Sequence, residues 1–131
     1  VEQPSDFVLF QNYPNPFNTT TTIRYAIPSR EQRAGSEEQR GRNIGLYALR
    51  TTLKIYNLLG QEVQTLVDET KEPGYYTVTW HGEDGLGREV VSGVYIYELK
   101  VVLSRRTPPD RELGFGKGEH WKETKKMVLL R

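Results

Sequence analysis

The sequence predicts an all-β domain, and three observations lead to this expectation. The chain holds 8 Tyr among many Thr and Val, which favour strands, beside 12 Gly and 7 Pro, which favour turns. Seven short segments alternate apolar and polar residues in the manner of half-buried strands, and turn residues separate them. No segment has sustained helical periodicity. The pattern favours a seven-stranded antiparallel Ig-like β-sandwich with two long charged loops at one end.

Length and composition narrow the class of protein. At 131 residues we expect a single domain, residues 1–131, that buries roughly two thirds of its unfolded surface. The absence of Cys excludes a disulfide framework and thiolate metal sites. The 18 Lys and Arg are balanced by 17 Asp and Glu, so we expect no nucleic-acid partner. No apolar run is long enough to span a membrane, and Val1 begins neither a signal peptide nor a typical translated chain, so we expect a piece of a longer precursor.

The first third of the chain contains two predicted strands and an ordered corner. The first strand is Phe7–Gln11, and the second, Thr20–Ile27, alternates until Pro28 ends it. Between them the segment NYPNPFN has two prolines and turn-forming asparagines, with Tyr13 and Phe17 available to plug the core. The predicted inward residues of the second strand are Thr21, Ile23, Tyr25 and Ile27.

The middle of the chain adds four strands joined by short turns. Each is an alternating or apolar run bounded by Gly, Pro or Asn. The runs are Tyr47–Asn57, Glu62–Asp68, Tyr75–Trp80 and Val94–Leu103, with a turn at LLGQ (58–61) and a glycine-rich loop at HGEDGLG (81–87). The predicted inward residues are Leu49, Thr51, Leu53 and Ile55 on the first run and Tyr76, Val78 and Trp80 on the third.

The last predicted strand, Lys122–Arg131, reads KETKKMVLLR and is apolar on both faces at its end. We expect it to pair with Val94–Leu103 and to close the sandwich. An open apolar sheet edge invites pairing with another chain, so the same segment is a candidate binding strand.

Two excursions, residues 29–46 and 104–121, are rich in charge and poor in apolar residues. In an Ig-like sandwich these two connections project from the same end, while NYPNPFN, LLGQ and HGEDGLG gather at the other. The excursions bring basic residues together, and two interpretations stay open: a surface for an anionic partner such as a cell-surface polysaccharide, or a solvated pair of loops with mixed charge. These residues are Arg30, Arg33, Arg40, Arg42, Arg105, Arg106 and Arg111.

Several sequence blocks together resemble a known family. QNYPNPFN with TTTIRYAIP, LKIYNLLGQEVQTLV, EPGYYTVTWHGEDGLGREVVSGVYIYELK and the final TKKMVLLR occur in this order. They look like the type A C-terminal sorting domain of the type IX (Por) secretion system. The middle part is also similar to the Ig-like domain of the flagellar hook-capping protein. The sequence departs from the family at His81, where Asp is usual, and in the length of the two excursions.

The resemblance implies a non-enzymatic module at the end of a secreted protein. Such a module is read by an outer-membrane translocon, and a sortase then anchors the cargo at the cell surface, so a secreted or cell-surface location is expected. The recognition residues that the resemblance implies are Lys125, Lys126, Met127, Val128, Leu129, Leu130 and Arg131.

Other functions have weaker support in the sequence. The loop HGEDGLG offers two carboxylates, too few for Ca²⁺, and Asp84 there suits a turn, so we expect no metal and no cofactor. His81 and His120 lack an evident catalytic partner, so we expect no enzymatic activity. Two alternatives to sorting stay open. One is a structural subunit whose copies pair or exchange strands, and the other is a carbohydrate-binding adhesion module with Tyr56, Tyr75 and Tyr97 as a stacking platform.

Overall fold

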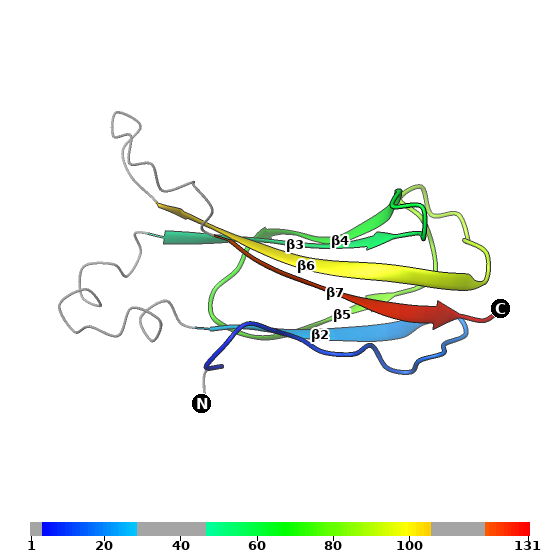
Figure 1. Cartoon of the computed structure of the whole chain (residues 1–131), viewed down its shortest axis with the longest axis horizontal. Coiled ribbons are helices and arrows are strands. Elements are labelled where there is room, and N and C mark those ends of the chain that lie inside the picture. Colours follow the sequence, from blue (N-terminus) through cyan, green and yellow to red (C-terminus); the bar gives the residue numbers. More distant parts are fainter. Residues whose placement is uncertain (1–3, 29–46, 106–119) are drawn as a thin grey trace.

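Two antiparallel β-sheets pack face to face in the computed structural model, which describes residues 4–28, 47–105 and 120–131 (Figure 1). The three-stranded sheet has the order β1-β2-β5 and the four-stranded sheet the order β4-β3-β6-β7. The strands are β1 (Val8–Leu9), β2 (Thr21–Ile27), β3 (Tyr47–Tyr56), β4 (Glu62–Thr70), β5 (Gly74–Trp80), β6 (Gly93–Arg105) and β7 (His120–Leu129). The predicted all-β Ig-like sandwich is thereby confirmed.

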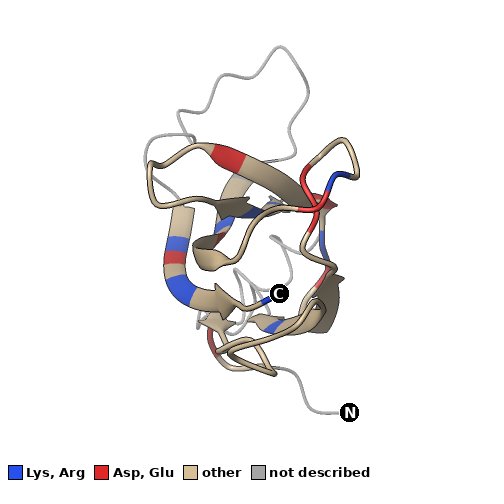
Figure 2. Cartoon of the chain, turned by 90° about the vertical axis from the view of Figure 1, so that its right-hand side faces the viewer, with Lys and Arg blue, Asp and Glu red and all other residues tan. Residues whose placement is uncertain are grey.

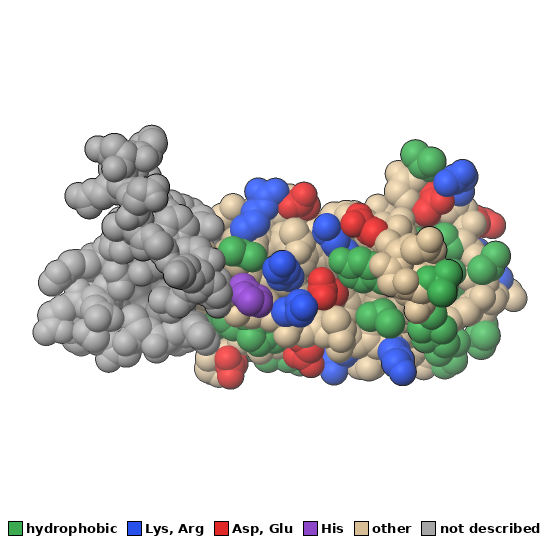
Figure 3. Space-filling view, turned by 45° about the horizontal axis from the view of Figure 1, so that its top comes forward, with side chains coloured by type: hydrophobic (Ala, Val, Ile, Leu, Met, Phe, Trp, Pro, Cys, Tyr) green, Lys and Arg blue, Asp and Glu red, His purple; other side chains and the backbone are tan. Residues whose placement is uncertain are grey.

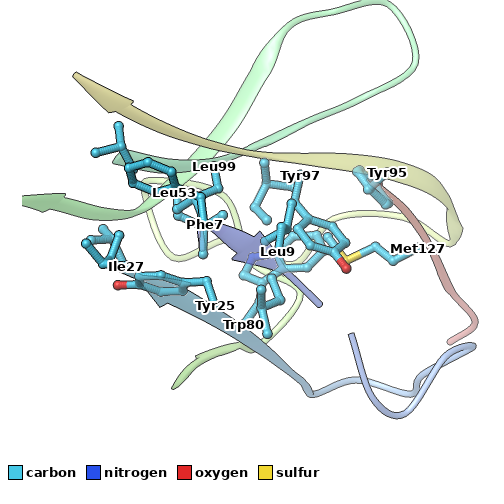
Figure 4. Close-up of a cluster of buried hydrophobic side chains, with 14 of the residues drawn as sticks. Phe7, Leu9, Tyr25, Ile27, Leu53, Trp80, Tyr95, Tyr97, Leu99 and Met127 are labelled. Carbon is cyan, nitrogen blue, oxygen red and sulfur yellow. The ribbon is translucent and has the colours of Figure 1, made fainter. Parts of the chain in front are cut away.

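The predicted strand faces are also confirmed. On β2, Ile23, Tyr25 and Ile27 are almost fully buried, and on β3 the same holds for Leu53 and Ile55. These side chains meet others from β5, β6 and β7 between the two sheets (Figure 4). Because successive residues of a strand point to opposite faces, one apolar row on each strand is enough to build this core. The fully buried side chains, by decreasing volume, are Trp80, Tyr25, Tyr97, Leu9, Ile23, Ile27, Leu53, Ile55, Leu99, Met127, Leu129 and Val101.

The closing strand pairs with β6 as expected, but β6 is longer than the sequence predicted, and β7 begins and ends two residues earlier than predicted. The ladder joins Tyr95 to Met127 and continues to Val101 opposite Trp121 and Val102 opposite His120. The predicted excursion 104–121 is therefore too long, because its first two and last two residues are strand residues. Trp121 is held there by stacking on Phe7, with ring centroids 5.1 Å apart.

The strands that border the two predicted excursions meet at one end of the four-stranded sheet. Tyr47, the first residue of β3, lies opposite Arg105, the last residue of β6. The excursions themselves, residues 29–46 and 106–119, lie outside the described residues, and so does any loop surface they form. The described part of the chain contains no helix of the length and apolarity needed to cross a membrane.

Candidate functional site

The opposite end of the sandwich, here called the corner end, is formed by residues 12–19, 57–61, 81–92 and 126–131. Figure 2 looks onto this end, with the C-terminal residue near its centre. The three tight corners predicted to gather there are in place. Hydrogen bonds join NYPNPFN to β2 and β7 and HGEDGLG to β4, and LLGQ is closed by bonds to Asn57. All of the residues implied in recognition except Lys125 lie on the corner end.

The corner segment 12–19 runs beside the outer edge of β7. The amide of Phe17 donates to the carbonyl of Val128 at 2.9 Å, and the amide of Leu130 donates to the carbonyl of Phe17 at 2.9 Å. The Asn15 side chain accepts from the amide of Val128 at 3.0 Å. The carbonyl of Lys126 accepts from the side chain of Gln11, just before the corner segment, at 2.8 Å. The last residues of the closing strand therefore have their outward main-chain groups bound by their own domain, which leaves no open edge there.

Arg131 connects the end of the chain to the loop 81–92. Its amide donates to the Ser92 hydroxyl at 2.8 Å, its Nε donates to the carbonyl of Val90 at 2.6 Å, and its Nη2 donates to the carbonyl of Gly82 at 2.7 Å. An ion pair with Glu89 at 3.8 Å adds to these contacts. Gly82 has φ +70°, and a Cβ there would lie 2.9 Å from Arg131 Nη2, so only glycine fits this position without displacing the guanidinium.

Trp80 lies under the corner end and contacts three of its parts. Its ring is 5.8 Å from that of Phe17 in the corner segment and 5.4 Å from that of Tyr95, edge to face, on β6. Its Nε1 donates to the carbonyl of Glu83 at 2.8 Å. The side chain is 1% exposed, so this hydrogen bond satisfies an indole N–H that burial removes from water.

Asp84 organises the glycine-rich loop. Its Oδ1 accepts from the amides of Leu86 and Arg88, each at 2.9 Å, and its Oδ2 lies 3.1 Å from Arg88 Nε. These donors, the Arg88 amide foremost, lower the pKa of Asp84 below its usual range. The predicted turn role of this carboxylate is confirmed. Across residues 4–28, 47–105 and 120–131, no three His, Asp or Glu side chains gather in a way that could hold a metal ion.

Asn12 and Tyr97 attach the corner segment to the core. The Asn12 amide donates to the Tyr97 hydroxyl at 2.8 Å, and that hydroxyl donates to the carbonyl of Phe10 at 2.8 Å. The Asn12 side chain donates to Thr21 Oγ1 at 2.9 Å and to the carbonyl of Pro14 at 3.1 Å. Asn12 is only 2% exposed, so these bonds compensate for the burial of its amide group. Sequence reasoning missed this pair, since an Asn before a proline-rich turn signals only a loop.

The buried tyrosines make stability sensitive to alkaline pH. Burial raises the pKa of Tyr97 and of Tyr25 to about 12. In the unfolded chain the two tyrosine hydroxyls lose their protons near pH 10. Between pH 10 and 12 these groups are therefore ionised only in the unfolded state, and this ionisation stabilises the unfolded state relative to the folded state. We expect the contribution of these two tyrosines to the free energy of unfolding to be constant below pH 10 and then to fall by about 1.4 kcal/mol per pH unit for each tyrosine.

Urea unfolding curves between pH 8 and pH 12 would measure this loss. The variant Tyr25→Phe removes one of these ionisations, so its free energy of unfolding should fall by about 1.4 kcal/mol less per pH unit than that of the wild type. An identical pH dependence in the wild-type protein and in this variant would contradict the assignment.

The structure separates the implied recognition residues into buried and accessible groups. Met127 and Leu129 are fully buried in the core, whereas Leu130 is 53% exposed. Lys125 lies 3.6 Å from Glu123 on the same strand, and Lys126 is exposed. Val128 is half-buried, and Arg131 is bound to the loop as described above. Of the seven basic residues of the excursions, Arg105 ends β6, and the other six lie outside the described residues.

The predicted tyrosine platform is wrong. Tyr97 is fully buried in the core. Tyr56 belongs to β3 and Tyr75 to β5, which are strands of different sheets. The Tyr75 ring instead lies 5.5 Å from the Arg24 guanidinium. Because successive residues of a strand point to opposite faces, Tyr97 lies on the inner face of β6. The same alternation in the sequence excludes Tyr97 from an exposed platform.

Exposed hydrophobic side chains concentrate at the corner end (Figure 3). Phe17 plugs the core as predicted, but Tyr13 does not and is 79% exposed. Of the seven large hydrophobic residues exposed among the described residues, only Tyr75 lies elsewhere. A cluster of this kind on a soluble surface marks an interaction site more often than chance exposure does. The six are Tyr13, Leu58, Leu59, Leu86, Val91 and Leu130.

Fold and contacts together define an Ig-like β-sandwich whose last strand is bound by its own loops. Residues 43–105, slightly less than half of the chain, match the family model of the FlgD Ig-like domain, which agrees with the expected similarity to the hook-capping protein. No curated protein matches the chain.

Two solved structures are similar to the chain over almost its whole length. Dimeric latent PorU from Porphyromonas gingivalis matches 99% of this chain and 10% of its own, with 17% identity and a TM-score of 0.59. PorZ, described as an essential surface component of the type IX secretion system of the same species, matches 95% of this chain and 11% of its own, with 16% identity and a TM-score of 0.44. The chain thus spans a small part of either protein, and the PorU likeness supports the fold.

Proposed function

We propose that the chain is a non-enzymatic C-terminal sorting and anchoring module, which directs a secreted protein through a type IX secretion system to the cell surface. One observation carries the proposal. The sequence blocks that resemble the sorting family are far apart in the chain, yet QNYPNPFN, the HGEDGLG loop and KKMVLLR bind one another at the corner end. A partner that touches this end would therefore meet several of the characteristic blocks at once.

The accessible chemistry of the corner end fits a protein partner. Its exposed side chains include six large hydrophobic ones, which favours an acceptor surface with apolar contacts on the secretion translocon. The outward main-chain groups of Val128 are already bound by the corner segment, so a partner has side chains rather than a free strand edge to recognise. The sortase, as second partner, would act after export. The carbohydrate-binding alternative loses its main support with the tyrosine platform.

Export of a fusion protein tests the proposal. A secreted reporter carrying residues 1–131 is expressed in a bacterium with a type IX system and in the same strain without its translocon. We expect surface display only in the first strain, and at least about a tenfold loss when Lys125–Arg131 are deleted, since a tenfold change corresponds to a modest 1.4 kcal/mol of binding. Equal export of the full and the shortened fusion would refute the role of these residues, and a full fusion that stays inside the cell would refute the sorting function.

A further inference from the structure

Each sheet of the sandwich has two edges, and three of the four are protected against pairing. The outer edge of β7 is bound by the corner segment in its second half, and β1 is only two residues long. The β4 ladder has two register shifts, and its edge carries Glu62, Asp68 and Glu69. Bulges, charges and short length are the usual ways in which proteins block edge-to-edge association.

The edge formed by β5 has none of these protections. Its sequence, GYYTVTW, contains no charged residue and no proline, and its seven pairs with β2 run without a register shift. Aromatic and β-branched residues of this kind favour an extended strand. An unprotected edge of this composition is a surface suited to receiving another strand.

The hydrogen-bond pattern shows which groups of β5 point outward. Thr22 and Arg24 of β2 direct their main-chain groups away from β5, to Tyr13 and Phe10. Their partners on β5 are Thr79 and Thr77, so these are non-hydrogen-bonded pairs whose own N–H and C=O groups face the free edge. Tyr75, two residues before Thr77, also directs its N–H and C=O groups toward the free edge. Within the described residues, no hydrogen bond occupies the outward main-chain groups of Tyr75, Thr77 and Thr79.

The outward residues of β5 are complementary to themselves in an antiparallel arrangement. When two copies of the strand pair around Thr77, each Thr77 faces its equivalent, and each Tyr75 faces Thr79 of the other copy. All of these residues turn their main-chain groups toward the edge, so donors meet acceptors along the whole contact. Thr–Thr and aromatic–β-branched neighbours are favourable cross-strand pairs. If two copies of β7 paired in an antiparallel arrangement instead, Lys122 of one copy would face Lys126 of the other. These like charges would repel each other.

We propose that a second copy of this chain docks on β5, antiparallel and with a twofold axis at Thr77, and joins the two three-stranded sheets into one continuous sheet. Such a contact uses the same surface on both copies and closes as a dimer rather than growing into a filament. The inference is independent of the sorting function, because β5 contributes to the corner end only through the buried Trp80. It also moves the predicted assembly edge from the closing strand to β5.

Analytical ultracentrifugation of the full chain across a concentration series tests the dimer. We expect the wild-type protein to pass from monomer to dimer, and the variant Thr77→Lys, which sets two ammonium groups against each other at the axis, to raise the dissociation constant at least about tenfold. Thr22→Lys is the matched control, since Thr22 is also exposed on the outer face of this sheet but lies on the inner strand β2. It should dimerise like the wild type.

Amide hydrogen exchange adds a readout at single residues. At concentrations where the dimer forms, the amides of Tyr75, Thr77 and Thr79 should exchange more slowly than in dilute samples, while circular dichroism verifies that both variants are folded. A wild-type protein that stays monomeric throughout, that forms larger assemblies, or whose association is unaffected by Thr77→Lys would overturn the proposal.

Discussion

Replacement of Trp80 by alanine is expected to lower the free energy of unfolding by about 3–5 kcal/mol, the usual loss for a buried aromatic side chain. Trp80 is 1% exposed and contacts Phe17 and Tyr95, so its removal leaves a cavity between the corner segment and β6. The carbonyl of Glu83 also loses its indole donor. Urea unfolding followed by far-ultraviolet circular dichroism measures the loss.

One further variant separates the contribution of the Trp80 N–H from that of its ring, and a second variant serves as a control. Trp80→Phe keeps most of the ring volume but removes the N–H, and should cost about 1–3 kcal/mol for the unpaired carbonyl and the smaller ring. Trp121→Ala is the matched control, because Trp121 is half-buried at the opposite end, where it stacks on Phe7. If Trp121→Ala destabilised the protein as much as Trp80→Ala, Trp80 would not be the centre of the corner end.

Most strands could be predicted because each is an amphipathic segment with a period of two residues. The rows through Ile23 and Leu53 are buried as the alternation requires. The boundary near Trp121 could not be predicted, since a charged segment containing one aromatic residue does not reveal that Phe7, far away in the sequence, will stack on it. Local pattern identifies strands, whereas their ends depend on distant partners.

The candidate site was harder to foresee for the same reason. Leu129 and Leu130 are equally apolar in the sequence, and only the packing of the closing strand shows that Leu129 is buried and Leu130 exposed. The protected edge of β7 and the open edge of β5 likewise depend on sheet order, which the strand pattern does not specify. The sequence predicted pairing at the apolar closing strand, whereas our proposal places it at the uncharged edge of β5.

Replacement of Leu130 by aspartate is expected to prevent most surface display of a fusion protein while leaving the fold intact. The side chain is 53% exposed at the corner end, so a charge there should change stability by no more than about 0.5 kcal/mol. It would, however, place an unpaired carboxylate in a hydrophobic interface, where burial without a partner is strongly unfavourable. Leu129→Ala, by contrast, should lower the free energy of unfolding by about 2–5 kcal/mol, because that neighbouring side chain is fully buried.

Thr70→Asp is the matched control for Leu130→Asp, because Thr70 is exposed and ends β4 at the other end of the sandwich, away from both the corner end and β5. Both variants are compared for thermal unfolding and for surface display of the reporter. If the corner end is the recognised surface, only Leu130→Asp lowers display, although the two proteins are equally stable. Equal display of both variants would mean that recognition does not involve the exposed residues of this end. An equal reduction would mean that any charge on the surface disturbs export, so Leu130 would have no special role.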